Sequence, residues 1–545
     1  MLDNNNKEKA VHLKPFQKGF APALLGLAVA LASHQAVAAP TIELGENTTL
    51  DSTLTVNYTA SVRTGKQAKE YLNELNSDDG TRNFERGALI TNRVSLFGEL
   101  MLKHKNLGAV LRGSHFYDAA YKNSNDNDSP STVNKAGQYN HFSSDTSRDS
   151  GSRARLLDAY VYGDFDVLDG QYLSLKAGRH LVAWGESLFW PNISQGQAPV
   201  DATKFNVPGT EAKDAYLPIG QVSATWTLND YLALVGYYQY EWEESQLSPV
   251  GDYFSTSDIF GPGAQFFRFA AGHPDFTSTR YVGEKDARDS GQWGLGVRYR
   301  ITDSTELGLF HNRYHERIGA MFFSWGADTV YSTLDAVMAD NTYQLAYFED
   351  VKLTGVSFSS KIGDSVQYAA DVSYRDGSAV YLDNGTPARG QVWQTNVNAM
   401  YMIGPNFLAQ QTSVYGEVMN QYIESVDEVK VTVGGFDAGT YDTFVYDGQT
   451  RSSTLLGLGA QFDNPGVFSG WDLTNKVSWQ QNIDGSPLQG LGRGEKRLTV
   501  SADLKYLGNF QVGVTYVDYL SSANVKHGRM MADRDYVSFN AKYSF

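Results

Sequence analysis

One stretch of about forty residues carries the side chains best suited to binding chemistry. Residues 183–219 include Trp184, Glu186, Phe189 and Trp190, followed by several prolines. Aromatic rings offer flat apolar area on which a hydrophobic molecule can stack, and a carboxylate among them can orient a polar group. Solvated loops are usually polar, so these rings need burial. The stretch is therefore either a binding platform or a structural plug, and both interpretations stay open.

Three more charged residues belong to the same candidate site. Arg179 precedes the aromatic residues, and Asp201 and Glu211 follow them. Charges enclosed in a lumen usually find partners, because an unpaired buried charge is costly. We therefore expect Arg179 to pair with Glu186, or else to act with it as a selectivity charge.

Catalytic and metal-binding patterns are weak in this chain. His311 and His315 lie four residues apart on an expected strand, about 13 Å from each other, which is too far to share a zinc ion. The acidic run 123–128 lacks the ligand spacing of a calcium loop. His180 lies near Ser187, but no nucleophile elbow or oxyanion motif accompanies them. We predict no enzyme activity, no cofactor and no metal site.

Strands with a two-residue apolar period surround the candidate site. In one of them, Leu157, Ala159 and Val161 alternate with Asp158 and Tyr160. Successive side chains of a strand point to opposite faces, so each such segment has an apolar face and a polar face. About 9–11 residues are enough for one tilted strand to cross a bilayer.

Eighteen segments follow this pattern. They lie near residues 54–62, 90–103, 107–118, 154–165, 171–182, 220–228, 231–242, 291–301, 304–314, 351–361, 365–375, 392–402, 406–418, 453–462, 470–481, 495–506, 509–519 and 535–545. Eight short connections, one of them at Asn464-Pro465-Gly466, alternate strictly with nine long ones. Outer-membrane barrels have an even strand number, short periplasmic turns and long external loops. The sequence predicts an all-β fold, a single transmembrane antiparallel β-barrel of about 18 strands, with its third external loop (about 183–219) folded into the lumen.

Charged residues interrupt the polar faces in the middle of several predicted strands. Charges there are costly toward lipid and cheap toward a wet lumen. We therefore expect the following residues to line the lumen: Arg298, Arg300, Asp371, Arg375, Arg497, Asp503 and Lys505.

The two ends of the chain indicate export. Four lysines precede an apolar run, Phe20 to Ala32, and Ala36-Val37-Ala38 supplies small residues for cleavage, as in a secretory signal peptide. We expect residues 1–38 to be cleaved and residues 39–545 to form the barrel. The last strand ends on Phe545, which resembles the signal read by the barrel-assembly machinery. The predicted location is the outer membrane of a Gram-negative bacterium, among lipid and lipopolysaccharide, with both termini in the periplasm.

Several motifs resemble a known family. They are Gly178-Arg179, Trp184-Gly185-Glu186-Ser187, Pro199-Val200-Asp201, Pro208-Gly209-x-Glu211 and Pro218. Together they resemble the family called domain of unknown function 1302, over nearly the whole mature chain. The resemblance implies an outer-membrane barrel of a kind that is often encoded with a partner lipoprotein and an inner-membrane pump of the resistance-nodulation type, which are therefore its expected partners. It also implies traffic in lipids or other hydrophobic compounds.

Composition narrows the function further. The chain has 545 residues, a mean hydropathy of −0.37 and no cysteine, so it is no helical membrane protein and has no disulfide. Its formal net charge of −16, without a basic stripe, argues against a nucleic-acid partner. We expect a channel or transporter for hydrophobic or amphipathic small molecules, gated or narrowed by the inward-folded loop. The alternatives are a general or ion-selective diffusion porin and a structural or surface-interaction barrel without transport.

Overall fold

Eighteen strands close into a barrel in the computed structural model, which describes residues 41–205, 215–273, 277–324, 342–433 and 436–545. Each barrel strand pairs antiparallel with the next barrel strand in the chain. The last, β25 (Tyr536–Ser544), pairs with the first, β2 (Thr48–Arg63), from Arg63–Tyr536 to Thr55–Ser544. The predicted all-β transmembrane barrel is confirmed.

The other barrel strands follow one another around the wall. They are β3 (Leu89–His104), β4 (Leu107–Asp118), β5 (Ser152–Leu168), β6 (Gln171–His180), β7 (Ile219–Thr227), β8 (Leu232–Gln239), β11 (Gln292–Thr302), β12 (Thr305–Tyr314), β15 (Val351–Ile362), β16 (Val366–Tyr381), β17 (Pro387–Met402), β18 (Gln411–Val426), β21 (Ser452–Phe468), β22 (Trp471–Asp484), β23 (Lys496–Tyr506) and β24 (Phe510–Asp518).

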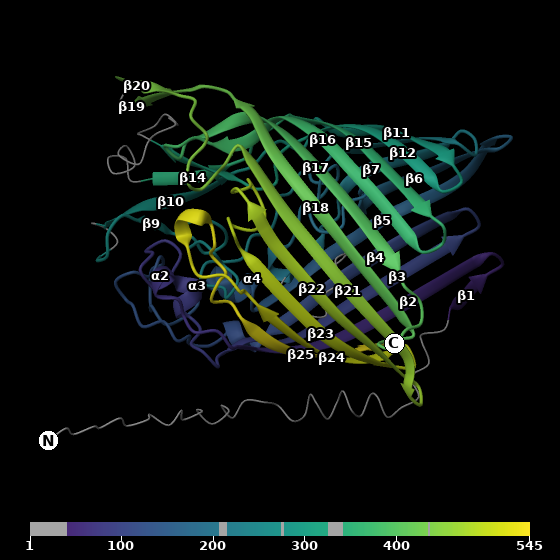
Figure 1. Ribbon diagram of the computed structural model, residues 1–545, viewed down its shortest axis with the longest axis horizontal. Helices are drawn as coiled ribbons and strands as arrows, with labels where there is room; N and C mark the ends of the chain where they lie inside the picture. Colours follow the sequence, from purple (N-terminus) through teal and green to yellow (C-terminus); the bar gives the residue numbers. More distant parts are fainter. Residues whose placement is uncertain (1–40, 206–214, 274–276, 325–341, 434–435) are drawn as a thin grey trace.

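The two ends of the barrel differ in the length of most of their connections. The predicted strict alternation fails at residues 382–386, because β16 and β17 extend farther than expected and leave five residues, fewer than the eight of the turn at 403–410. At one end, called the turn end, short turns join the strands, and both β1 (Ile42–Gly45) and the carboxyl terminus lie there (Figure 1). At the other, called the loop end, nine loops alternate with these turns. In chain order, loops 1 to 9 are residues 64–88, 119–151, 181–218, 240–291, 315–350, 382–386, 427–451, 485–495 and 519–535.

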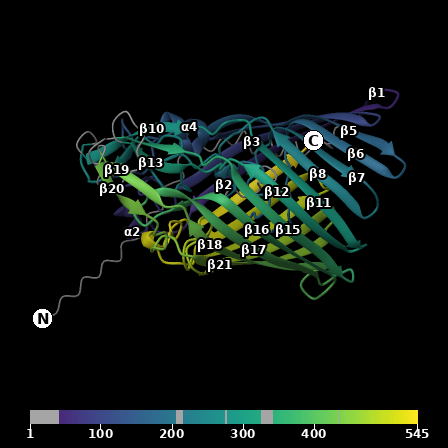
Figure 2. The ribbon, with the colours of Figure 1, turned by 90° about the horizontal axis from the view of Figure 1, so that it is seen from above.

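The loops carry small elements of their own at the loop end (Figures 1 and 2). Short helices are α2 (Lys69–Leu72), α3 (Asp79–Arg82), η1 (Ala119–Tyr121), α4 (Ser144–Asp149), α5 (Ala202–Phe205) and η2 (Val525–His527). One small sheet joins β9 (Phe266–Arg268), β10 (Ser278–Lys285), β13 (Ala320–Ser324) and β14 (Thr342–Ala346), and another joins β19 (Val429–Val433) and β20 (Phe436–Tyr441). Within the described ranges, no helix is long and apolar enough to cross a membrane.

The period of two separates an oily outside from a polar inside. Val161 and Val514 point outward and are 58 % and 50 % exposed, which suits contact with lipid tails. On the inner face of the closing seam, the buried Ser61 and Ser538 hydroxyls are hydrogen-bonded at 2.8 Å. Burial of the inner face comes from the loops that fold over it.

One predicted turn is wrong. β21 continues through Asn464-Pro465-Gly466 to Phe468, and the turn is Ser469-Gly470. The ladder is irregular between Asn464 and Phe468, because Pro465 has no N–H to donate to its partner strand. The Gly466 amide donates instead to the Asp472 carboxylate at 2.9 Å.

A bulge changes the facing of the loop-end half of β5. The register with β4 shifts between Leu111 and Gly113, so β5 accommodates an extra residue. As a result Leu156 is 50 % exposed on the outside, whereas Leu157, predicted to face outward, is buried.

The predicted signal peptide, residues 1–38, lies outside the described residues.

Val514→Arg is expected to lower the free energy of unfolding by about 2–4 kcal/mol, the cost of a guanidinium near the bilayer midplane. The measurement is a denaturant titration of the refolded protein in lipid vesicles. Thr515→Arg is the matched control, because the next side chain along β24 points inward. Equal losses in the two variants would contradict the assignment of the outer face.

Candidate functional site

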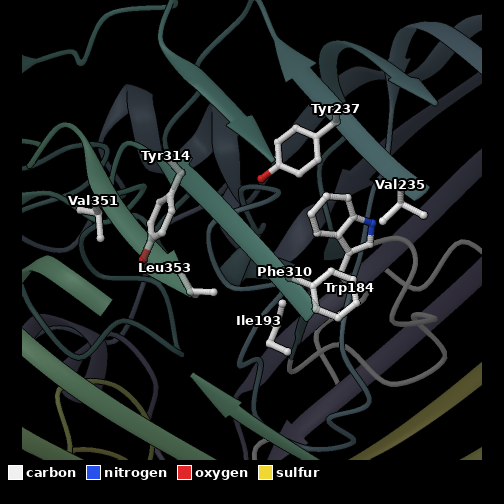
Figure 3. Packing of buried hydrophobic residues seen from close by; sticks show 8 residues of the cluster. All are labelled: Trp184, Ile193, Val235, Tyr237, Phe310, Tyr314, Val351 and Leu353. Atoms are coloured by element: carbon white, nitrogen blue, oxygen red, sulfur yellow. The ribbon is translucent and has the colours of Figure 1, made fainter. Parts of the chain in front are cut away.

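Loop 3 leaves the wall after β6 and packs inside the barrel. Trp184 is 6 % exposed, and its ring lies 5.2 Å from that of Phe310 on β12 and 5.0 Å from that of Tyr237 on β8. Figure 3 shows these rings together with Ile193, farther along loop 3. Val351 and Leu353 of β15 belong to the same apolar cluster. The aromatic start of loop 3 is therefore anchored to the inner wall.

Main-chain amides of loop 3 bind two carboxylates on the wall. Asp371 of β16 accepts from the amide of Glu186 at 2.8 Å and from the Ser187 hydroxyl at 2.7 Å. Gly185, at a φ of +95°, brings the loop close to this carboxylate: a Cβ there would lie 2.7 Å from its oxygen. The predicted lumen residue Asp371 is thus a docking group for the loop.

Glu417 of β18 is the second anchor. Its carboxylate accepts from the amides of Leu188 at 2.5 Å, Phe189 at 3.3 Å and Trp190 at 3.1 Å. The Asn396 side chain on β17 donates to the same carboxylate at 2.9 Å. Amides that converge on one anion form charge-assisted hydrogen bonds, which are stronger than neutral ones. Glu417 was not predicted, although it is a charged residue in the middle of a strand, like the predicted lumen residue Asp371.

Apolar packing accompanies this docking. Phe189 stacks on Tyr415 of β18 with ring centres 6.0 Å apart. It also lies against Gly457 of β21, where a Cβ would come within 2.7 Å of the ring. Trp190 packs against the cluster formed by Met419 and Leu455. These rings, predicted as contacts for a substrate, are occupied in holding the loop.

Asparagine and glutamine side chains fix the middle of the loop. Asn192 donates to the Asn396 amide oxygen at 3.0 Å and to the main-chain carbonyls of Asp371 and Gln394. Arg375, a predicted lumen charge, donates to Gln195 of the loop and to Gln394 at 2.8 Å. None of these amides was predicted, because Asn and Gln are common in ordinary loops.

The later part of loop 3 contacts β5, the strand that precedes β6 in the wall. The buried carboxylate of Asp201 pairs with Arg153 and, at 3.0 Å, with Arg155, both on the loop-end half of β5. Arg155 also donates to Gln246 of loop 4 at 3.2 Å. Asp201 therefore ties loop 3 to β5, while Glu211 lies outside the described residues.

The barrel wall extends less far toward the loop end where loop 3 leaves it, because β6 ends before β5 does. The β5–β6 ladder ends at the pair Ala159–Arg179. Residues 152–158 of β5 continue toward the loop end and pair with β4 alone among the described strands. Roughly 20 Å of strand edge is therefore unpaired. A free edge leaves N–H and C=O groups available to another partner.

Arg179 lies at the base of this free edge. It shares the register of Ala177 and Val222, which face outward, and not that of the lumen. Its guanidinium donates to Glu241 at 2.5 Å and to Glu243 at 2.8 Å, both in loop 4. The expected pairing of Arg179 with Glu186 is wrong, because the two side chains belong to opposite faces of the wall.

Glu186 itself stays on the inner side. Burial, and then the negative charge of Asp371, raise the pKa of the Glu186 carboxyl, while Arg298 on β11 lowers it. Arg298 also lies 3.6 Å from Glu306 of β12. These groups form a small charged cluster beside the docked loop.

A cavity of about 470 Å³ lies against the free edge of β5. Leu156 and Arg155 line it from β5, Arg179 from β6, and Leu217 and Glu243 from the loops. It therefore combines an outward-facing apolar side chain with a charged rim. A cavity of this size can hold a small molecule.

A second hollow continues over the outer face of the wall. It measures about 460 Å³ and shares Arg155 and Leu156 with the first. Leu96, Gly98 and Gly113 line it on β3 and β4, and a Cβ at Gly98 would meet nothing within 4 Å. Together the two hollows run from the membrane-facing surface to the rim beside Arg179.

The remaining predicted lumen charges lie on two strands. Arg298 and Arg300 are on β11, and Arg497, Asp503 and Lys505 are on β23. Arg497 donates to Gln480 of β22, and Asp503 accepts from Gln511 of β24 at 3.0 Å, so both have polar partners on the neighbouring strands. The residues of β23 lie six strands from β5 around the barrel, whereas Arg298 lies near Glu186 of loop 3.

Known proteins resemble this chain to different degrees in sequence and in fold. The sequence matches the family described as "Protein of unknown function (DUF1302)" over residues 19–545. It has no significant match among curated proteins. Acinetobacter baumannii OccAB3 resembles it with a TM-score of 0.43 and 11 % identity, over 91 % of this chain and 99 % of that one. Pseudomonas aeruginosa OpdK, solved with vanillate, has a TM-score of 0.41 and 11 % identity, over 91 % and 98 %. TM-scores and identities this low say nothing about which molecule this chain binds or transports.

Glu417→Ala is expected to free the start of loop 3, because three amides lose a charged acceptor. Hydrogen bonds to charged groups contribute about 1.5–3 kcal/mol, so amide exchange at residues 188–190 should accelerate by about tenfold to a hundredfold. Hydrogen–deuterium exchange measures this. Glu99→Ala is the control, since Glu99 pairs with Arg112 on β4. Unchanged exchange in Glu417→Ala would contradict the docking.

Proposed function

The chain belongs to the DUF1302 family, and we propose that it is an outer-membrane channel for hydrophobic or amphipathic small molecules, lipid-like or aromatic. The observation that carries the proposal is the cavity beside the free edge of β5. Ala154, Leu156 and Leu217 line its smaller, apolar part, and charged or polar side chains, among them Arg155, Arg179 and Glu243, line the larger part. A molecule with an apolar body and a polar head matches both parts.

Loop 3 supports the proposal as the element that narrows the path. Its docking on Asp371 and Glu417 fills the inner side of several strands. Because loop 3 leaves the wall here, β5 has no described strand paired with its β6 side beyond Ala159. One feature of the chain thus accounts for a narrowed lumen and for a hollow that opens toward lipid.

The proposal extends to location and partners. We place the turn end, with both chain ends, in the periplasm of a Gram-negative bacterium, and Phe545 as part of the signal for barrel assembly. In support, the Phe545 amide donates to the Leu54 carbonyl at 2.9 Å, next to the closing seam. A periplasmic lipoprotein and an inner-membrane pump would meet the barrel at the turn end. No chemical step is proposed.

A diffusion porin is the second candidate, favoured by one observation. Several inward-facing residues away from loop 3 are charged and of both signs, among them Glu99, Arg112, Lys176, Asp503 and Lys505. Such a wall suits water and hydrophilic solutes. The two candidates differ in what passes quickly.

Proteoliposomes in sugar or amino-acid solutions separate the two candidates. We expect swelling close to that of protein-free vesicles, because the docked loop narrows the aqueous path. The measurement is light scattering after an osmotic shift. Rapid entry of small sugars would contradict the proposal of a channel for hydrophobic molecules and favour a diffusion porin.

Leu156→Trp is expected to fill the cavity and weaken binding of a fluorescent medium-chain fatty acid by about tenfold, or 1.4 kcal/mol. The measurement is a fluorescence titration of the protein in nanodiscs. Leu111→Trp is the matched control: Leu111 is 48 % exposed on the same outer face of β4, but it does not line the cavity. Equal affinities in the two variants would contradict the proposed binding site.

A further inference from the structure

Three buried aspartates meet where loops 1 and 4 pack together at the loop end. Asp78 and Asp79 begin the short helix α3, and Asp258 belongs to loop 4. One carboxylate oxygen of each lies within 4.8 Å of the other two. The three residues are 0 %, 2 % and 1 % exposed. Three carboxylates so close and so deeply buried need either protons or a cation.

Two carboxylate oxygens of these aspartates accept no hydrogen bond from a described residue. Asp258 Oδ2 accepts from the Asp79 amide at 3.0 Å, and Asp78 Oδ2 accepts from Arg82 at 2.5 Å and from Thr132 at 2.9 Å. The Oδ1 atoms of Asp78 and Asp258 have no hydrogen-bond partner among the residues that the structure describes. A buried carboxylate oxygen without a donor is costly, and a metal ion removes that cost.

Loop 2 supplies the third side of the cluster. Asn127 donates to Asp79 Oδ1 at 3.2 Å, and the Asn134 amide donates to Asp79 Oδ2 at 3.1 Å. The side-chain oxygen of the fully buried Asn134 also has no partner in the described ranges. The cluster thus offers oxygen atoms only.

Nearby cationic side chains leave these free oxygens uncovered. Arg82 donates to the other oxygen of Asp78 and also to Asp128. Lys135 and Arg268 donate to main-chain carbonyls. Arg534 donates to the Thr81 hydroxyl and to the adjacent carboxylate at 533. Among these described cationic side chains, Arg82 alone hydrogen-bonds to an aspartate of the cluster.

We propose that Asp78, Asp79 and Asp258 bind a calcium ion that ties loop 1 to loop 4. Calcium accepts six to eight oxygen ligands in flexible geometry, whereas magnesium demands a tight octahedron and keeps several waters. The proposal replaces the expectation of no metal site and does not depend on the transport proposal. The sequence shows no ligand spacing here, because Asp79 and Asp258 are 179 positions apart.

Calorimetric titration with calcium chloride tests the proposal on the protein refolded without lipopolysaccharide, which itself binds calcium, and stripped with EDTA. We expect one ion per chain, with a Kd of about 10⁻⁴ to 10⁻³ M as in extracellular modules. Calcium should also raise the midpoint of thermal unfolding, and magnesium should do so less. Absence of binding to the wild-type protein, or tighter binding of magnesium, overturns the proposal.

Asp258→Asn is expected to raise the Kd for calcium by about tenfold or more. In EDTA this variant should unfold no earlier than the wild type, because one of three repelling charges is gone. Asp252→Asn is the matched control: Asp252 is a buried acid of the same loop that accepts from Ser150 and Phe254, and calcium binding should survive there. Unchanged binding in Asp258→Asn, or early unfolding of that variant in EDTA, overturns the proposal.

Discussion

A sheet that crosses a membrane has to give every main-chain N–H and C=O a partner, because hydrocarbon offers none and each unpaired group costs several kcal/mol. This chain meets the constraint by pairing β2 with β25, so that the barrel has no edge through most of its height. The constraint is relaxed at the loop end of β5, where β6 has already ended at His180. Above that point β5 is paired on one side only, among the described residues.

The short strand β6 connects the two features that we associate with transport. Because the chain leaves the wall at His180, loop 3 is free to cross the barrel and dock on Asp371 and Glu417. For the same reason, the wall beside β5 has a hollow lined by Leu156 and Arg179. The aromatic rings of loop 3 stabilise its docking, and we therefore propose the gap beside β5, and not the loop itself, as the binding site.

Much of the fold could be predicted because strand periodicity is a local property. Alternation of apolar and polar residues located all eighteen strands, and the aromatic composition of residues 183–219 indicated an inward fold. Errors arose where geometry depends on a partner strand. The bulge opposite Arg112 exchanged the facing of Leu156 and Leu157, and no local pattern announces such a bulge.

The candidate site was harder to predict, because its contacts join residues far apart in the chain. Arg179 and Glu186 are seven positions apart, yet they face opposite sides of the wall, and Arg179 pairs with loop 4. Glu417 binds amides 227 to 229 positions away. Asp79 and Asp258 meet only after loops 1 and 4 pack together. The spacing of residues in the sequence carries no information about such long-range contacts.

Thiol labelling can show whether an amphipathic molecule occupies the gap beside β5, because the chain contains no cysteine of its own. Leu156→Cys places a single thiol in the gap, and Tyr117→Cys places one on the outer face of the neighbouring strand, away from the cavity lining. The labelling rate with a water-soluble maleimide is compared with and without a medium-chain fatty acid. We expect the fatty acid to slow labelling at position 156 and not at position 117. Equal rates at position 156 with and without the fatty acid would contradict this expectation.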